Sequence, residues 1–557
     1  MIHEPEVIVA GGGPAGIACA VALARGDRRV VLLEAELAAR DHVGESLSPT
    51  AWQAVLRLGA AAAMRGAGFC PKLGATFSWS GQASPWTVSY PMVDDQPPAY
   101  QARRAKFDAI LLTAASAAGA DVQLGWRVEQ ILPPSSGTAS VLATSPYGES
   151  VRLAAPWVVD ARGRSGPNQS RHAYRTGPAE LDHAALWGFW RRRTGSPPDS
   201  RRTSLLIGRP EHCLWYYPLD EMASLASVGV VISAQADDDP VGGAEKLYRA
   251  AVASCPELMP LLSGTVLEGP VRSCAANAGA CEQMAGDGWF LVGDAAFFVD
   301  PLLTPGVQLA IEHGTLAAAC LLTLLNRRED RASVLELYDQ VIRRDYETYV
   351  RLSSNLYHAA RTSAGPVPGQ AQVPPADGQF AFLSLISGLP RSELAARLGE
   401  YMSLRNAVAE RGGAAVALGE KEGFSFLRWL FHKDRLIAER SARIVSRLAD
   451  DCVLRPAVGA AIGHEAFLPA DGGQVLTFQP AVRNRLGDRF AATPELAALF
   501  AVLGEGRPLA EIRRLFRQKA PDTGAGCSSA FDAWIELLAD HALVEWALAR
   551  EGDVCVA

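Results

Sequence analysis

Residues 11–16 read Gly-Gly-Gly-Pro-Ala-Gly, and this stretch decides the fold of the first part of the chain. The apolar run at 6–10 precedes it, and a helix-like stretch begins at Ile17. A second apolar run, 30–33, ends in Glu34. Strand, glycine loop, helix, strand and acid within about 30 residues form the fingerprint of a dinucleotide-binding unit.

The residues of this fingerprint each have a physical role. Gly11 permits the tight turn, Gly13 lets the backbone approach a pyrophosphate, and Gly16 lets the helix pack on the strand. The helix N-terminus offers amide donors to the anion, and Glu34 can accept hydrogen bonds from both ribose hydroxyls. The predicted dinucleotide-binding residues are Gly11, Gly13, Pro14, Ala15, Gly16 and Glu34.

The composition is that of an ordinary globular protein of two or three domains. Of its 557 residues, 49% are apolar and 20% are charged, with a net charge of −7. The chain has no Lys/Arg block, which argues against a nucleic-acid partner. Its ten cysteines show neither CxxC spacing nor a histidine cluster, so we expect reduced thiols and no metal site. The pattern shows no export signal and no membrane span, which favours a cytoplasmic protein.

Two further motifs indicate a flavin rather than a nicotinamide. Asp160-Ala161-Arg162-Gly163 ends an apolar run, and Gly293-Asp294-Ala295-Ala296 precedes a helix expected over 307–325. In flavin monooxygenase-like folds the aspartate of the second motif binds the ribityl chain. The helix entrance, from Pro301 to Gly306, faces the pyrimidine end of the flavin. Because only one GxGxxG is present, we predict FAD supplied reduced by a separate flavin reductase, or reduced by NAD(P)H.

The sequence predicts an α/β protein with several regions. They are a Rossmann-like FAD-binding domain over 1–362, an inserted β-rich substrate subdomain at about 72–105 and 175–275, a Pro/Gly-rich linker at 363–378, a helical region at 379–469 and a small α+β domain at 470–557. The β-rich part is expected to cover the substrate pocket.

Several stretches resemble the flavin-dependent halogenases. Besides the glycine loop, they are Val43-Gly44-Glu45-Ser46-Leu47 and GDAAFFVDPLLTPGVQLA at 293–310. The strongest local match runs from Lys72 to Trp79, KLGATFSW, followed by PWTVSY at 85–90. The resemblance covers about residues 1–360 and is to members that act on phenolic or other aromatic groups, often tethered to a carrier protein.

The resemblance implies O2-activating chemistry on an aromatic ring. Reduced FAD and O2 give a flavin C4a-hydroperoxide, halide takes its distal oxygen, and the hypohalous acid travels to a separate substrate site. Lys72 is the residue that the resemblance nominates to hold the active halogen. The remaining implied site residues are Glu45 and Ser46 at the cofactor, and Thr304, Gly306, Trp79, Trp215 and Tyr217 in the halide or substrate pocket.

The segment 213–218, Cys-Leu-Trp-Tyr-Tyr-Pro, departs from the Trp-x-Trp-x-Ile-Pro pattern of the family. Those bulky residues separate substrate from flavin, so the change at Cys213 keeps hydroxylation of a bulky or protein-borne aromatic as an alternative to halogenation. Another flavin oxidation and a non-enzymatic flavin-binding role also stay open. Leu303 replaces the glutamate of free-tryptophan halogenases, which favours a tethered substrate. Residues 274–281 contain no acid, so we predict non-covalent FAD.

Overall fold

A computed structural model of the chain describes most of its first 361 residues. The described ranges are 4–79, 85–89, 99–135, 137–165, 174–195, 203–233, 243–302, 305–326 and 331–361, together with short segments between 453 and 556. The chain divides into two compact units, Met1–Phe424 and Ser425–Ala557. The site lies in the first unit.

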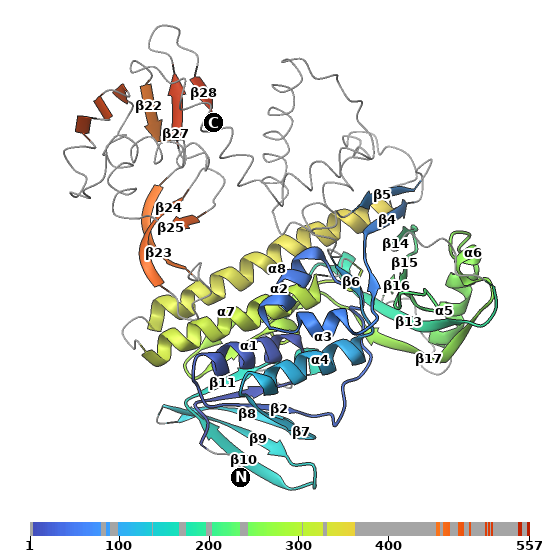
Figure 1. The fold of residues 1–557 in the computed structure, drawn as a ribbon, viewed down its shortest axis with the longest axis horizontal. Helices are drawn as coiled ribbons and strands as arrows, with labels where there is room; N and C mark the ends of the chain where they lie inside the picture. The colour runs from blue at the N-terminus through green and yellow to red at the C-terminus, as the bar shows by residue number, and fades with distance from the viewer. Residues whose placement is uncertain are drawn as a thin grey trace. The chain divides into compact units, whose positions relative to one another are not determined.

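A mostly parallel sheet forms the centre of the first unit (Figure 1). Its strands, in spatial order, are β19 (Ala285–Gly286), β20 (Trp289–Leu291), β11 (Trp157–Asp160), β1 (Val7–Ala10), β2 (Val30–Glu34) and β7 (Asp121–Leu124). The chain leaves β1 for β2 on one side, and β11 pairs with β1 on the other. Such a reversal of strand order places a ligand crevice at the carboxyl ends of the strands.

Helices cover this sheet and close its core. They are α1 (Pro14–Arg25), α2 (Pro49–Arg57), α3 (Ala61–Arg65), α4 (Arg104–Ala117), α7 (Gly306–Asn326) and α8 (Arg331–Arg361). α7 approaches α1 closely at Gly314, where a Cβ would lie 2.0 Å from the backbone oxygen of Ala15. α7 is long and apolar enough to span a membrane, but 83% of its apolar stretch is buried inside the protein. It is therefore a core helix.

Small sheets complete the flavin part of the unit. One consists of β8 (Arg127–Ser135), β9 (Thr138–Thr144) and β10 (Ser150–Ala155), another of β12 (Arg175–Thr176), β18 (Gly279–Ala280) and β21 (Phe297–Phe298), and a third of β3 (Cys70–Pro71) and β6 (Tyr100–Gln101). The first of them packs its apolar face, which includes Ile131 and Val141, against Ile8 and Val158 of the central sheet.

A seven-stranded sheet forms the β-rich part. Its order is β17 (Thr265–Ala275), β13 (His183–Arg192), β16 (Leu225–Ser233), β15 (His212–Pro218), β14 (Thr203–Gly208), β4 (Gly74–Trp79) and β5 (Trp86–Ser89). Helices α5 (Gly243–Ala253) and α6 (Leu258–Leu262) bury one face against Leu214, Tyr216 and Val230. Because side chains alternate along a strand, Cys213, Trp215 and Tyr217 lie on the opposite, inner face. The predicted Rossmann-like and β-rich parts of the fold are thus confirmed.

The second unit contains two antiparallel sheets within its described residues. They are β26 (Arg507–Pro508), β22 (Val453–Pro456), β27 (Val544–Ala547) and β28 (Val554–Val556), and separately β23 (Ala461–Phe467), β24 (Thr477–Arg483) and β25 (Arg489–Ala491). The expectation of helix up to residue 469 is wrong at β22 and β23, where β-branched and aromatic residues pair with later strands. The second compact unit comprises Ser425–Ala557, and the start of a small domain at 470 stays a prediction. The predicted linker lies outside the described residues.

Candidate cofactor and active site

A cleft of about 860 Å³ opens at the carboxyl ends of the central strands. Its walls come from the N-terminus of α1, the turn after β11, the segment 292–301 and the first turn of α7. This volume is in the range of cofactor and small-molecule sites. Of the residues predicted from sequence, the cleft brings together Gly13, Pro14, Ala15, Asp294, Pro301 and Gly306.

The glycines of the first loop fall into two physical classes. Gly11 has a φ of +114°, and a Cβ there would lie 2.3 Å from the backbone oxygen of Ala161. A Cβ on Gly16 would lie 2.0 Å from the backbone oxygen of Gly11. Both are therefore packing positions. A Cβ on Gly13, in contrast, would meet nothing within 4 Å, so this glycine borders open cleft.

The N-terminus of α1 is suited to an anion. Gly13 is its N-cap, and no side chain caps the helix. The first amides of a helix carry partial positive charge and need an acceptor, which a pyrophosphate supplies. The residues present thus fit a dinucleotide at this end of the cleft.

Glu34 is held at the carboxyl end of β2 by two backbone amides. The Gly12 N–H donates to Oε2 at 2.6 Å, and the Glu36 N–H donates to Oε1 at 2.9 Å. Each carboxylate oxygen keeps a second lone pair, so the group can still accept a ribose hydroxyl. Glu34 lies outside the cleft lining found among the described residues.

Asp294 occupies the middle of the cleft wall. It sits on a short 3-10 turn, Gly293–Ala295, whose Gly293 has a φ of +58°. Burial raises the pKa of the Asp294 carboxyl, and the charges of Arg164, Arg104 and His313 oppose that rise. A carboxylate in such a place can accept hydrogen bonds from the hydroxyls of a ribityl chain.

Arg104 supports the loop that borders the cleft, and the sequence reading missed it. Its buried guanidinium donates to Asp108 through Nε at 3.1 Å and Nη2 at 3.0 Å, while Nη1 donates to the Val43 carbonyl at 2.8 Å. Val43 and Gly44 line the cleft with it. The sequence signal for this ion pair is an Arg and an Asp four residues apart on a helix.

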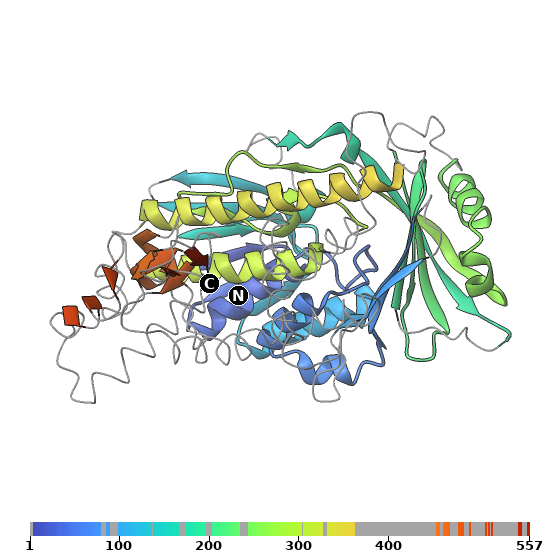
Figure 2. The ribbon, with the colours of Figure 1, turned by 90° about the horizontal axis from the view of Figure 1, so that it is seen from above.

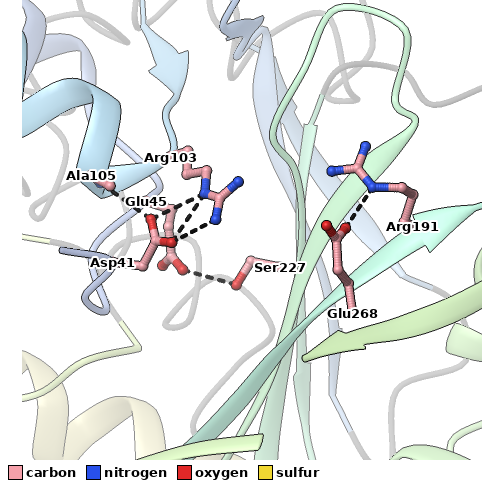
Figure 3. Close-up of polar contacts among 7 residues, drawn as sticks. All are labelled: Asp41, Glu45, Arg103, Ala105, Arg191, Ser227 and Glu268. Carbon is pink, nitrogen blue, oxygen red and sulfur yellow. Dashed lines mark hydrogen bonds and ion pairs between the residues drawn. The ribbon is translucent and has the colours of Figure 1, made fainter. Parts of the chain in front are cut away.

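Glu45 and Ser46 do not line the cleft among the described residues, although Gly44 before them does. Figure 3 shows Glu45 directed toward Ser227 of β16, whose hydroxyl donates to Oε1 at 3.0 Å. The Gly44 N–H donates to Oε2 at 3.1 Å. Burial raises the pKa of Glu45 to about 7. The side chain thus links the cleft-bordering loop to the seven-stranded sheet, called the substrate sheet below after the role predicted for it. Direct contact of Glu45 or Ser46 with FAD stays a prediction.

Lys72 is buried, with 2% of its surface exposed. Its ammonium donates to Ser46 Oγ at 2.7 Å, and Ser46 Oγ lies 3.1 Å from Ser204 Oγ on β14. Gln101 Nε2 donates to the same Ser204 oxygen at 2.8 Å. Burial lowers the pKa of Lys72 to about 7, which makes a neutral amine accessible near neutral pH. A solvated surface lysine would keep a pKa near its ordinary value and stay charged at neutral pH.

The predicted pocket aromatics are all buried on the inner face of the substrate sheet. Trp215 stacks with Tyr217 at 5.9 Å between ring centroids, and its Nε1 donates to Ser227 Oγ at 3.2 Å. Glycines make room for the indoles: a Cβ on Gly229 would lie 2.0 Å from Trp215, and one on Gly208 2.9 Å from Trp79. Thr304 and Leu303 lie outside the described residues.

Comparisons with known proteins agree with this architecture. The model of the FAD binding domain family matches residues 4–351. Among curated proteins, the tryptophan 2-halogenase of Chondromyces crocatus is 28% identical over 400 residues, covering 69% of this chain and 76% of that protein. The 1H-pyrrole-2-carbonyl-[peptidyl-carrier protein] chlorinase of Pseudomonas fluorescens is 26% identical over 378 residues, covering 64% of this chain and 84% of that protein.

Two solved structures share the fold over nearly the whole chain. CmlS, a flavin-dependent halogenase, has a TM-score of 0.70 at 20% identity and covers 100% of this chain and 98% of its own. The peptidyl tryptophan dihydroxylase QhpG has a TM-score of 0.62 at 18% identity and covers 97% of this chain and 100% of its own. At these identities the likeness concerns the fold alone.

The glycine loop, the cleft with Asp294 and the family match over residues 4–351 lead to one conclusion. The chain belongs to the FAD binding domain family and is an FAD-dependent oxidoreductase that is similar in sequence to flavin-dependent halogenases.

Proposed function

We propose that this protein halogenates an aromatic ring that is tethered to a carrier protein or peptide. Bound reduced FAD would supply the activation of O2, and halide would bind beside it at the entrance of α7, near Gly306 and Thr304. The observation that carries the proposal is the buried Lys72, held at Ser46. Gly11, Gly13, Pro14, Ala15, Gly16, Glu34 and Asp294 would hold the cofactor.

Lys72 has the properties that capture of an oxidised halogen requires. A neutral amine reacts with hypohalous acid to form an N–halogen bond and water, whereas an ammonium can only hydrogen-bond the acid. Burial lowers the pKa of Lys72 to about 7, so the ammonium and the neutral amine are both populated near neutral pH. The inner-face aromatics Trp79, Trp215 and Tyr217 would separate the substrate from the flavin.

A tethered substrate is supported by two observations. One curated relative is named for action on a pyrrole carbonyl bound to a peptidyl carrier protein. In addition, Leu303 stands at the position where free-tryptophan halogenases carry a glutamate. A separate flavin reductase is the proposed source of reduced FAD.

FAD is proposed to be held non-covalently, because residues 274–281 offer no carboxylate for a bond to the flavin. Acid precipitation of the purified holoprotein should leave the yellow colour in the supernatant. A flavin that remains in the washed pellet would contradict this part of the proposal.

Hydroxylation of a bulky or protein-borne aromatic is the second candidate function. Cys213 and Tyr217 replace a Trp and an Ile of the halogenase pattern, which weakens the barrier between flavin and substrate. In that case oxygen would pass directly to the ring without halide. Lys72 would then be structural or would bind substrate.

The Lys72→Ala variant distinguishes the two functions. Because Lys72 would position a diffusing oxidant, its loss should lower the yield of halogenated product by at least about 100-fold, while reduced flavin is still reoxidised at the wild-type rate. Lys106→Ala is the control, since Lys106 donates to the backbone oxygen of Ala67 and lies over the Phe69 ring, and does not line the cleft found among the described residues. Substantial product from Lys72→Ala would overturn the role given to Lys72.

A further inference from the structure

A buried carboxylate lies in the cleft wall where the chain approaches α7. Asp300 follows β21 and lines the cleft together with Pro301, the next residue. The Asp300 side chain has no exposed surface. Its Oδ1 accepts the Leu302 N–H at 2.8 Å, and its Oδ2 accepts the Tyr357 hydroxyl at 2.7 Å. Burying a carboxylate is costly unless donors satisfy it, so these contacts fix the conformation of 300–302.

Tyr357 reaches this loop from the far end of α8. Figure 2 shows α8 (yellow) running from the flavin part of the unit to the substrate sheet. Near its end, Ala360 packs against β14, where a Cβ on Gly208 would lie 3.0 Å from Ala360 Cβ. Tyr357 is 4% exposed. The last turns of α8 therefore contact both the cofactor loop and the substrate sheet.

The surroundings of Tyr357 keep it a neutral hydrogen-bond donor. Burial, and next the charge of Asp300, raise the pKa of its hydroxyl well above 10. His183 of β13 packs its ring 4.3 Å from the Tyr357 ring. The His183 Nδ1 lies 3.9 Å from Asp300 Oδ2, too far for a hydrogen bond. Burial, followed by the charge of Arg361, lowers the pKa of His183 to about 4, so its ring is neutral.

We propose that Tyr357 is a positioning residue, which holds Asp300 and thereby sets the flavin-facing wall 300–302 against the substrate sheet. The geometric part of this inference concerns only contacts within the chain. Its consequence for turnover rests on the proposed function, because a displaced wall would misalign the flavin with the inner face of the sheet.

Tyr357→Phe tests the geometric part in the full chain. The amide hydrogen exchange of Leu302 should accelerate about tenfold, as expected for loss of a hydrogen bond to a charged group. Tyr338→Phe is the matched control. Tyr338 lies on the same helix, is fully buried, and donates to the Leu291 carbonyl at 2.7 Å, away from Asp300. Its Leu302 exchange should equal that of the wild type.

Asp300→Asn serves as a second variant if Tyr357→Phe fails to fold. It keeps the side-chain shape but loses one acceptor oxygen, so it too should accelerate the exchange of Leu302. Unchanged exchange in the folded variants, or equal acceleration in Tyr338→Phe, would overturn the proposal.

A second readout separates this inference from the proposed function. In Tyr357→Phe the yield of halogenated product per flavin reoxidised should fall about tenfold, while the dissociation constant for FAD changes less than about twofold. A wild-type enzyme that makes no halogenated product would refute the proposed function, and the exchange of Leu302 would still decide the role of Tyr357. An unchanged yield in a variant with accelerated exchange would overturn the link to turnover.

Discussion

At the scale of single residues, burial moves the pKa values of Lys72 and Glu45 toward neutrality from opposite sides. Burial lowers that of Lys72 to about 7 and raises that of Glu45 to about 7. Glu45 accepts a hydrogen bond from Ser227 of the substrate sheet. Lys72 is connected to Ser204 of the same sheet through Ser46. The junction between cofactor loop and substrate sheet therefore changes charge in the range where the enzyme is expected to work.

When the pH rises from about 5 to about 7.5, the wild-type protein should lose folding stability through the ionisation of Glu45. The Glu45→Gln variant should lose less over the same range. The folded-state pKa of Glu45 is raised, so the protonated form favours folding below about 4.5, and this stability is lost as the pH rises through about 7. The substitution removes the titration. Thermal midpoints of wild type and variant at the two pH values measure the difference.

Glu257→Gln is the control for this experiment. Hydrogen bonds from Arg209 and Ser78 outweigh burial and lower the pKa of Glu257 to about 2, so Glu257 is ionised at both pH values. Its loss should shift both midpoints alike. Equal pH dependence in wild type and Glu45→Gln would contradict the buried, titrating role of Glu45.

The sequence could assign residues whose role follows from local backbone geometry. Gly13 of the glycine loop and Asp294 line the same cleft because each follows directly on a strand of the central sheet, and their contact with FAD stays a prediction. The hydrogen bonds around Lys72 could not be predicted, because they join residues that are distant in the sequence. Lys72 and Ser46 lie 26 positions apart, and Ser46 and Ser204 lie 158 positions apart. The direction of the Glu45 side chain toward Ser227 could not be predicted either, because a sequence pattern fixes position but not side-chain orientation.

At the scale of elements, two glycines of the first loop allow close packing, and the third borders the cleft. Gly11 and Gly16 leave no room for a Cβ, whereas Gly13 faces open space. The same short loop thus contains two positions that serve packing and one that is predicted to serve cofactor binding. α7 uses the same device at Gly314, which lies against Ala15. No period in the sequence marks Gly314 as a contact position.

Gly16→Ala and Gly13→Ala should therefore have different effects. Gly16→Ala should destabilise the fold by about 3 kcal/mol or more, because a backbone oxygen must move. Gly13→Ala should change stability by less than about 1 kcal/mol but weaken FAD binding about tenfold or more, because its methyl group enters the cleft. Thermal melts of the apoprotein and fluorescence titration with FAD measure the two quantities. Normal FAD affinity in Gly13→Ala would refute the placement of the pyrophosphate there.

At the scale of the whole molecule, the first unit joins a mostly parallel sheet, predicted to bind the nucleotide, to a mostly antiparallel sheet, predicted to face the substrate. The two sheets could be predicted because one shows buried apolar runs and the other alternating ones. Strand β22 of the second unit could not be predicted, since it has four residues and pairs with β26 and β27, which lie far along the chain. The Tyr357 contact at the end of α8 offers a physical link between cofactor wall and substrate sheet.

The central claim is that an oxidised halogen, and not an oxygen atom, is transferred to the ring. The most direct measurement exposes the photoreduced FAD enzyme to oxygen-18 gas with and without chloride or bromide, using monochlorodimedone and a carrier-tethered phenol as acceptors. We predict halogenated acceptors only when halide is present, with no oxygen-18 in the organic product. Halide-independent product that carries oxygen-18 would contradict the account and establish hydroxylation.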